Sequence, residues 1–221
     1  MGEEPERIVN SGCPSSDTLC HQDLGISNEK MHEYNSGVGY QIDFTKPYIL
    51  MMQHPVTTTP EEGRVQVEKT LAALKDREEQ KIVMWPNIDA GSDLVSRGIR
   101  IFRENNSGSN FAYCKNFPPE IYNCILKNAI CAVGNSSSFI REASFLGTPA
   151  VIVGDRQEGR EHGGNVVLVD YDTEEIARGV EAQIAHGRYE PETIFGKGNA
   201  GEIIADYLAK VELSIHKRMT Y

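Results

Sequence analysis

The chain has 221 residues and carries 32 acidic against 22 basic side chains, which gives a formal net charge of −10. This balance argues against an extended nucleic-acid-binding surface, although a local basic pocket for a phosphorylated small molecule can still occur. No run of 18 apolar residues occurs, and Met1 is followed by an acidic stretch rather than by a secretion signal. We therefore expect one cytoplasmic α/β domain with some extension, a small-molecule partner, no nucleic acid and no membrane.

The cysteine pattern is typical of neither a metal site nor a disulfide framework. The chain has five cysteines, an odd number, with no CxxC pair and no histidine at a ligand spacing. We expect reduced and mostly buried thiols, and neither a metal nor a cofactor.

Apolar runs alternate with helical patterns after a polar segment or linker, residues 1–45, in which only Arg7–Val9 and Cys13 hint at a strand. The expected strands are, in chain order, Tyr48–Met52, Ile82–Trp85, Phe111–Cys114, Ala129–Val133, Ala150–Val153 and Val166–Val169. The expected helices run from Thr59 or Pro60 to about Glu79, from Ser92 or Asp93 through Phe102, over Pro118–Lys127, from the serines at 136–138 to Leu146, from Asp172 or Thr173 to about His186, and over Asn199–Ile215. This alternation is typical of a parallel sheet with helices on both faces.

The stretch Ala129–Gly147 joins an apolar strand to a polar turn and then to an amphipathic helix. Gly134 and Asn135 allow a sharp turn, and Ser136–Ser138 supply hydroxyls and backbone N–H groups at the start of the helix, where anions bind. Glu142 follows within two turns, so the ribose of a nucleotide whose phosphate lies at the serines would be within its reach. The alternative is that the three serines merely cap a helix.

Four loops follow the carboxyl ends of expected strands, and in a doubly wound sheet they converge on one crevice. They are His54–Thr58, Pro86–Ser92, Gly134–Ser138 and Gly154–Gly164. Their polar groups suit a diphosphate with an attached sugar and base. No loop carries a GxGxxG, P-loop or GxSxG motif, which argues against those classes of site.

Each of these polar residues also has a purely structural interpretation. His54 can be a buried hydrogen-bonding residue, and Asn87 can be an ordinary turn residue. Arg156 and Arg160 can pair with neighbouring glutamates in a solvated loop. The recurrence of polar groups at the same end of successive strands favours the functional interpretation.

An ordered set of motifs resembles the hydrolysing UDP-N-acetylglucosamine 2-epimerases of sialic-acid precursor synthesis, and it extends from about Glu3 to Leu208. The motifs are Gly12–Ser15, Gln53–Thr58, Pro86–Ser92, Gly134–Ser137, Gly147–Pro149, Arg156–Glu161 and Asn165–Val166. The resemblance implies that UDP-N-acetylglucosamine and water give N-acetylmannosamine and UDP, through elimination of UDP to a glycal and hydration of that glycal. It implies that His54 and Asn87 contact UDP, that Ser136 and Ser137 hold its phosphates, that Glu142 holds the ribose and that Arg156 contacts the phosphate or the sugar.

The resemblance also implies a two-domain architecture like that of GT-B glycosyltransferases, of which this chain matches only the second half. Residues 46–198 would be the Rossmann-like UDP-binding domain, and residues 199–221 a closing helix that crosses to a first domain. His54 is the one catalytic candidate, because it can offset charge on the departing diphosphate. We locate no convincing acid and base carboxylates here, so we expect the isolated chain to be inactive.

We expect the chain to work as a homo-oligomer or with a separately encoded first Rossmann domain. Two alternatives stay open. One is a GT-B glycosyltransferase half, and the other is a non-catalytic module that binds a nucleotide sugar.

Overall fold

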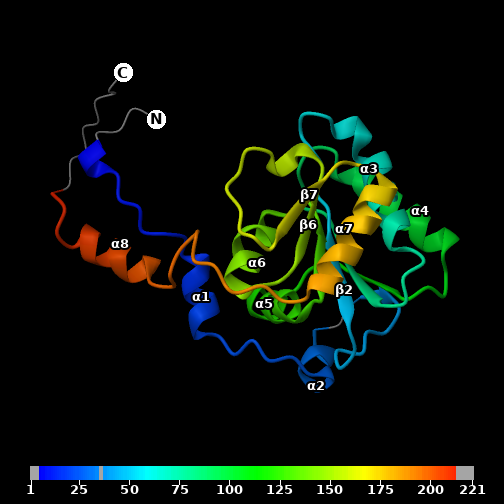
Figure 1. The fold of residues 1–221 in the computed structure, drawn as a ribbon, viewed down its shortest axis with the longest axis horizontal. Helices are drawn as coiled ribbons and strands as arrows, with labels where there is room; N and C mark the ends of the chain where they lie inside the picture. The colour runs from blue at the N-terminus through cyan, green and yellow to red at the C-terminus, as the bar shows by residue number, and fades with distance from the viewer. Residues whose placement is uncertain (1–4, 35–36, 213–221) are drawn as a thin grey trace. The chain divides into compact units, whose positions relative to one another are not determined.

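Two compact units make up the chain in the computed structural model, which describes residues 5–34 and 37–212. Residues 1–22 and 193–221 form a terminal unit, and residues 23–192 form a central unit (Figure 1). The expected divisions at residues 45 and 198 stay predictions about the complete protein.

A seven-stranded sheet forms the middle of the central unit. Its strands are β1 (Val38–Gly39), β2 (Tyr48–Met52), β3 (Gln80–Met84), β4 (Phe111–Cys114), β5 (Cys131–Gly134), β6 (Ala150–Val153) and β7 (Val166–Val169). Their order across the sheet is β1-β4-β3-β2-β5-β6-β7, and only β1, which pairs with β4, runs antiparallel to its neighbour. The strands from β2 to β6 are almost wholly buried, which explains their continuous apolar character. The expected Rossmann-like α/β fold is confirmed.

The direction of winding reverses between β2 and β5. From β2 the chain moves outward through β3 to β4, and then it returns to place β5 on the other side of β2. Met52, at the end of β2, therefore pairs with Met84 of β3 on one side and with Gly134 of β5 on the other. Open α/β sheets bind ligands outside the carboxyl ends of strands at such a switch point.

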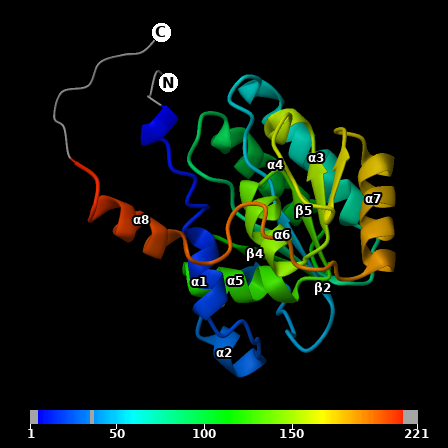
Figure 2. The ribbon, with the colours of Figure 1, turned by 60° about the vertical axis from the view of Figure 1, so that its left-hand side comes forward.

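Helices cover both faces of this sheet, with α3, α4 and α7 on one face and α5 and α6 on the other (Figure 2). The helical segments of the central unit are α2 (Asn28–His32), η2 (Pro60–Glu62), α3 (Gly63–Leu74), α4 (Ser92–Asn105), α5 (Pro119–Asn128), η3 (Ser137–Phe139), α6 (Arg141–Leu146), η4 (Asp155–Gln157) and α7 (Thr173–His186). The core on the first face joins strand side chains such as Met51 and Val83 to helix side chains such as Leu71, Ile99 and Val180. All of these are 1% exposed or less.

Two expected boundaries are wrong, and at the start of β3 the reason is that polar residues lie in the core. We expected a helix to about Glu79 and a strand from Ile82, but α3 ends at Leu74 and β3 begins at Gln80. The Gln80 amide donates to the carbonyl of Asp43 at 2.9 Å, and the buried Lys81 ammonium donates to Asn110 Oδ1 at 2.8 Å. A buried polar side chain is tolerated when it is hydrogen-bonded, but hydrophobicity along the sequence does not reveal it.

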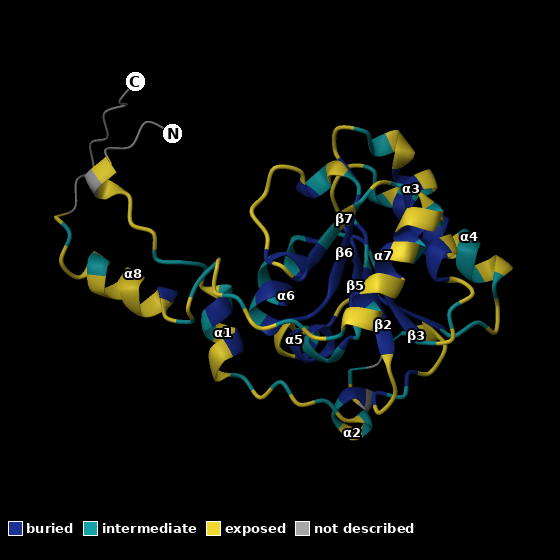
Figure 3. Ribbon diagram, in the orientation of Figure 1, coloured by how far each residue is buried: buried dark blue, intermediate teal, exposed yellow. Residues whose placement is uncertain are grey.

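The terminal unit contains η1 (Pro5–Arg7), α1 (Ser15–His21) and α8 (Ala200–Leu208). The strand suggested at Arg7–Val9 is wrong, since this stretch ends a 3-10 turn and continues without pairing to any described strand. Of the α8 residues only Ala200 is buried, and Leu208 is 57% exposed (Figure 3). The expected last helix, Asn199–Ile215, is too long, because α8 ends at Leu208. Leu213 and Ile215, included in that helix, lie outside the described residues. Within the described ranges, no helix combines the length and the apolar character needed to cross a bilayer.

We expect Gly134→Ala to destabilise the protein much more than Gly159→Ala does. Both glycines have a positive φ, of 135° and 72°, but a Cβ at Gly134 would lie 2.1 Å from the carbonyl oxygen of Met52, whereas one at Gly159 meets nothing within 4 Å. The free energy of unfolding in urea should fall by about 2–4 kcal/mol for Gly134→Ala and by about 1 kcal/mol for Gly159→Ala. Equal losses would show that β2 and β5 can separate freely at this point.

Candidate functional site

Asn135 joins three of the loops that leave the carboxyl ends of the strands. Its side chain is fully buried, accepts from the N–H of His54 at 2.7 Å and donates to the carbonyl of His54 at 2.9 Å. Its own carbonyl accepts from the Arg156 guanidinium at 3.0 Å and from the Gln157 amide at 2.7 Å. The loops after β2, β5 and β6 are thus fixed to one another. Sequence reasoning treated Asn135 only as a turn residue, because a side-chain amide that pairs with a distant backbone leaves no local signal.

His54 lies in the loop after β2, and one of its ring nitrogens is hydrogen-bonded to the loop after β3. Its Nδ1 accepts from the backbone N–H of Asn87 at 3.1 Å, so the neutral ring carries its proton on Nε2. Burial, helped by the positive charge of Arg156 and opposed by Asp89, lowers the pKa of His54 to about 4. At neutral pH, His54 in the unliganded chain is therefore an uncharged N–H donor.

Asn87 and Arg156 both approach the carboxylate of Asp89. The Asn87 amide donates to Asp89 Oδ2 at 2.5 Å, and the Arg156 guanidinium lies 4.0 Å from the same oxygen. The Oδ1 atom of Asn87 is buried without a hydrogen-bond partner among the described residues. Arg160 is exposed, so of the two arginines it is Arg156 that points back to the site.

The three serines precede the α-helix instead of starting it, which corrects the expectation from the sequence. Ser136 caps the 3-10 turn η3, and α6 begins only at Arg141 and has six residues. Phe139 and Ile140 are fully buried or nearly so, and they place this turn against the core before the helix starts. An anion here would be bound mainly by hydroxyl groups, since so short a helix offers little dipole.

Glu142 lies in the first turn of α6 with its side chain only 11% exposed. One carboxylate oxygen lies 3.5 Å from the Arg141 guanidinium, and the other, Oε2, is buried with no hydrogen-bond partner in the described part of the chain. A buried carboxylate oxygen without a donor is costly, so a ligand hydroxyl that donates to it would gain more than a hydroxyl at the surface.

Five of the six residues selected from the sequence therefore surround one point of the sheet. His54, Asn87 and Arg156 are joined through Asn135 and Asp89, and Ser136 and Ser137 directly follow Asn135. Glu142 is on the next helix along the chain, and no hydrogen bond to the other five is described. Among the residues that the structure describes, no three His, Cys, Asp or Glu side chains gather as a metal site.

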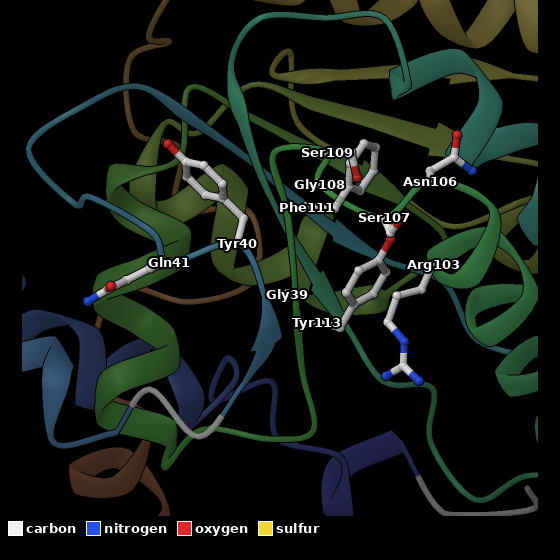
Figure 4. A pocket seen from close by; sticks show the side chains of 10 residues that line it. All are labelled: Gly39, Tyr40, Gln41, Arg103, Asn106, Ser107, Gly108, Ser109, Phe111 and Tyr113. Atoms are coloured by element: carbon white, nitrogen blue, oxygen red, sulfur yellow. The ribbon is translucent and has the colours of Figure 1, made fainter.

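A separate cavity of about 350 Å³ lies at the amino end of β4, away from these loops (Figure 4). It lies between the end of α4, the loop that follows α4 and the edge strand β1, and Arg103, Tyr40 and Tyr113 are among the residues that line it. None of the residues selected from the sequence belongs to its lining.

A sequence profile of the family described as UDP-N-acetylglucosamine 2-epimerase matches residues 1–209. The chain belongs to this family.

Two relatives in this family illustrate the range of similarity. The UDP-N-acetylglucosamine 2-epimerase of Neisseria meningitidis serogroup B is 29% identical over 199 residues, which are 90% of this chain and 50% of the relative. The UDP-N,N'-diacetylbacillosamine 2-epimerase (hydrolyzing) of Legionella pneumophila is 27% identical over 96% of this chain and 54% of its own length. The chain spans about half the length of the curated relatives it matches.

Solved structures share the fold. The UDP-GlcNAc 2-epimerase of Neisseria meningitidis, bound to UDP-GlcNAc, matches with a TM-score of 0.70 and 18% identity over 95% of this chain and 57% of its own. The UDP-GlcNAc 2-epimerase of Methanocaldococcus jannaschii, in complex with UDP-GlcNAc and UDP, matches with a TM-score of 0.67 and 19% identity. The match covers 94% of this chain and 56% of that enzyme. The fold is therefore that of one half of a GT-B-type epimerase.

We expect this member of the epimerase family to lose stability as the pH falls from 7 to 5, and His54 to account for much of the loss. Because its folded pKa of about 4 lies below the usual 6.5, the unfolded chain takes up a proton in this window that the folded chain does not. The contribution of His54 to the free energy of unfolding should fall by about 1–2 kcal/mol between these pH values. In His54→Asn, whose amide oxygen can replace Nδ1, the loss should be smaller by that amount.

The exposed His186 supplies the control for this measurement. Urea unfolding at both pH values should give the same pH dependence for His186→Asn as for the wild type. A wild type and a His54→Asn variant with equal pH dependence would contradict a buried neutral imidazole.

Proposed function

We propose that this chain is the UDP-binding half of a hydrolysing UDP-N-acetylglucosamine 2-epimerase that serves amino-sugar or sialic-acid precursor synthesis in the cytoplasm. The observation that carries the proposal is the meeting of the His54 imidazole, the Arg156 guanidinium and the loop of Ser136 and Ser137 at the switch point between β2 and β5. These groups are hydrogen-bond donors around one point, which is the environment that a diphosphate requires.

Each selected residue has a role in this proposal. The hydroxyls of Ser136 and Ser137 and the guanidinium of Arg156 bind the diphosphate, and Glu142 accepts from the ribose hydroxyls through Oε2, which has no donor among the described residues. Asn87 Oδ1, also buried without a partner in the described ranges, can accept from UDP. The ligand thus supplies hydrogen-bond donors to two buried acceptors.

His54 is the proposed catalytic residue on this half. Elimination breaks the bond between the anomeric carbon and the diphosphate oxygen, which keeps the electron pair, while a base removes the proton at C2 to give the glycal. The His54 Nε2–H can donate a hydrogen bond to the departing diphosphate. The negative charge of the diphosphate would raise the pKa of His54 and strengthen this hydrogen bond. Water then adds across the double bond, with the proton delivered to the opposite face of C2.

The other half of the enzyme is proposed to supply the groups that move these protons. The curated relatives, which are about twice as long as this chain, support this part of the proposal. Helix α8 exposes Ile203, Ile204 and Leu208, as expected of a helix that would pack on a first Rossmann-like domain. That domain would come from a separately encoded chain, or a homo-oligomer would complete the site.

We expect the chain to bind UDP with modest affinity and Glu142→Ala to weaken this binding about tenfold or more, because a hydrogen bond to a charged group is lost. Isothermal titration calorimetry measures both affinities. The exposed Glu181→Ala, on α7, is the matched control and should bind like the wild type. Equal UDP binding by the wild type and Glu142→Ala would remove Glu142 from the site.

We expect negligible turnover of UDP-N-acetylglucosamine by the chain alone and clear turnover once the first half of a family member is supplied, because only one wall of the cleft is present. The product distinguishes the alternatives. Free N-acetylmannosamine supports the hydrolysing reaction, UDP-N-acetylmannosamine would show a non-hydrolysing epimerase, and transfer that depends on an acceptor would show a glycosyltransferase. UDP-N,N'-diacetylbacillosamine should be assayed in parallel, since a relative is named for it.

Robust release of N-acetylmannosamine by the 221-residue chain alone would contradict the proposal in another way. It would mean that the proton-transferring groups lie within this half.

His54→Asn should lower the turnover of the reconstituted enzyme, while His186→Asn should leave it unchanged.

A further inference from the structure

Three hydroxyl groups form a continuous chain beside the proposed diphosphate site. The phenol oxygen of Tyr122, on α5, lies 2.5 Å from Ser138 Oγ, and Ser138 Oγ lies 2.9 Å from Ser136 Oγ. The backbone N–H of Ser138 also donates to Ser136 Oγ, at 3.4 Å. Ser136 is only 5% exposed, so its hydroxyl hydrogen needs an acceptor within the protein or on a ligand.

The inventory of donors and acceptors favours one direction for this chain of hydroxyl groups. In the described part of the structure, Ser138 is the one hydrogen-bond partner of the Tyr122 hydroxyl, and the phenol hydrogen has an acceptor there only when Tyr122 donates to Ser138. The Ser138 oxygen is thereby an acceptor, and its own hydrogen points to Ser136. Ser136 Oγ then accepts from the hydroxyl and from the backbone N–H of Ser138, which uses both of its lone pairs. The hydroxyl hydrogen of Ser136 then points away from Ser138 and Tyr122.

The phenol keeps its proton under all ordinary conditions. Burial and the negative charge of Glu142 raise the pKa of Tyr122 well above its usual value, against the smaller effect of the hydrogen bond with Ser138. At physiological pH the phenol therefore retains the hydrogen that it can donate to Ser138. Hydrogen bonds that run in one direction also polarise one another, which strengthens the last donor.

We propose that Tyr122 is a positioning residue that, through Ser138, turns the hydroxyl hydrogen of Ser136 toward an oxygen of the bound diphosphate. This inference rests on the proposed function for the ligand, although any diphosphate would serve as the acceptor. Tyr122 touches no ligand in this arrangement. Its effect is to remove the cost of orienting Ser136 when the anion binds.

Without the Tyr122 hydroxyl, the direction of the chain is no longer fixed. The Ser138 hydroxyl could then accept from Ser136, and the hydrogen of Ser136 would no longer be held toward the ligand. Tyr122→Phe removes one oxygen and keeps the ring, so the packing of α5 against α6 is preserved. The effect should appear in the binding of phosphate groups and should depend on Ser136.

The test is a double-mutant cycle with two ligands, UDP and inorganic pyrophosphate, measured by calorimetry on the whole chain. Tyr122→Phe should weaken the binding of both ligands about three- to tenfold, as expected for one net hydrogen bond. In a Ser136→Ala background the same substitution should have no further effect, because the hydroxyl that Tyr122 orients is gone. The matched control is Tyr189→Phe, which removes a phenol hydroxyl that donates to Gln183 Oε1 at 2.7 Å near the end of α7 and should leave both affinities unchanged.

Each contrary result has a separate meaning. Unchanged affinity in Tyr122→Phe, an equal loss in the Ser136→Ala background, or an equal loss in Tyr189→Phe would overturn the positioning role. If pyrophosphate follows the expected pattern and UDP does not bind, the positioning role stands and the proposed function fails. If the wild type binds neither ligand, both are overturned.

Discussion

The side-chain amide of Asn135 holds together the two strand ends on which the whole site depends. It pairs with both backbone groups of His54 as a neighbouring strand would, at the place where β2 and β5 end and their ladder stops. Because Asn135 is fully buried, each of these bonds lies in a low dielectric, and loss of one partner would leave an unsatisfied polar group. The positions of His54, Arg156 and the serine loop all follow from this one residue.

The same burial decides the chemistry of the site. A buried imidazole that receives a backbone N–H on Nδ1 and lies beside a guanidinium stays neutral, with its proton on Nε2. The Oδ1 of Asn87 and the Oε2 of Glu142 are buried acceptors without donors in the described residues. The site therefore combines donors suited to a diphosphate with acceptors suited to sugar and base hydroxyl or N–H groups, and a nucleotide sugar carries both kinds of partner.

Membership of the epimerase family and the GT-B-type fold agree with this arrangement, and the chain spans about half the length of the relatives. The sheet and its switch point are complete within the central unit, whereas the relatives are about twice as long as the chain. A binding wall can form from one Rossmann-like half, because its residues come from the loops of one sheet.

The sequence by itself determined the order of the strands and helices that follow residue 45, and through its motifs it indicated His54, Asn87, Ser136, Ser137, Glu142 and Arg156. It did not indicate α1, α2 or the edge strand β1. Apolar runs of four or five residues identify buried parallel strands because both faces are covered. Only the tertiary structure decided where β3 begins, since the buried Gln80 and Lys81 look like surface residues until their partners are known. It alone also assigned Asn135 and Tyr122 their places, because a hydrogen bond between residues distant in the chain depends on how the strands and helices are packed, and local sequence carries no trace of it.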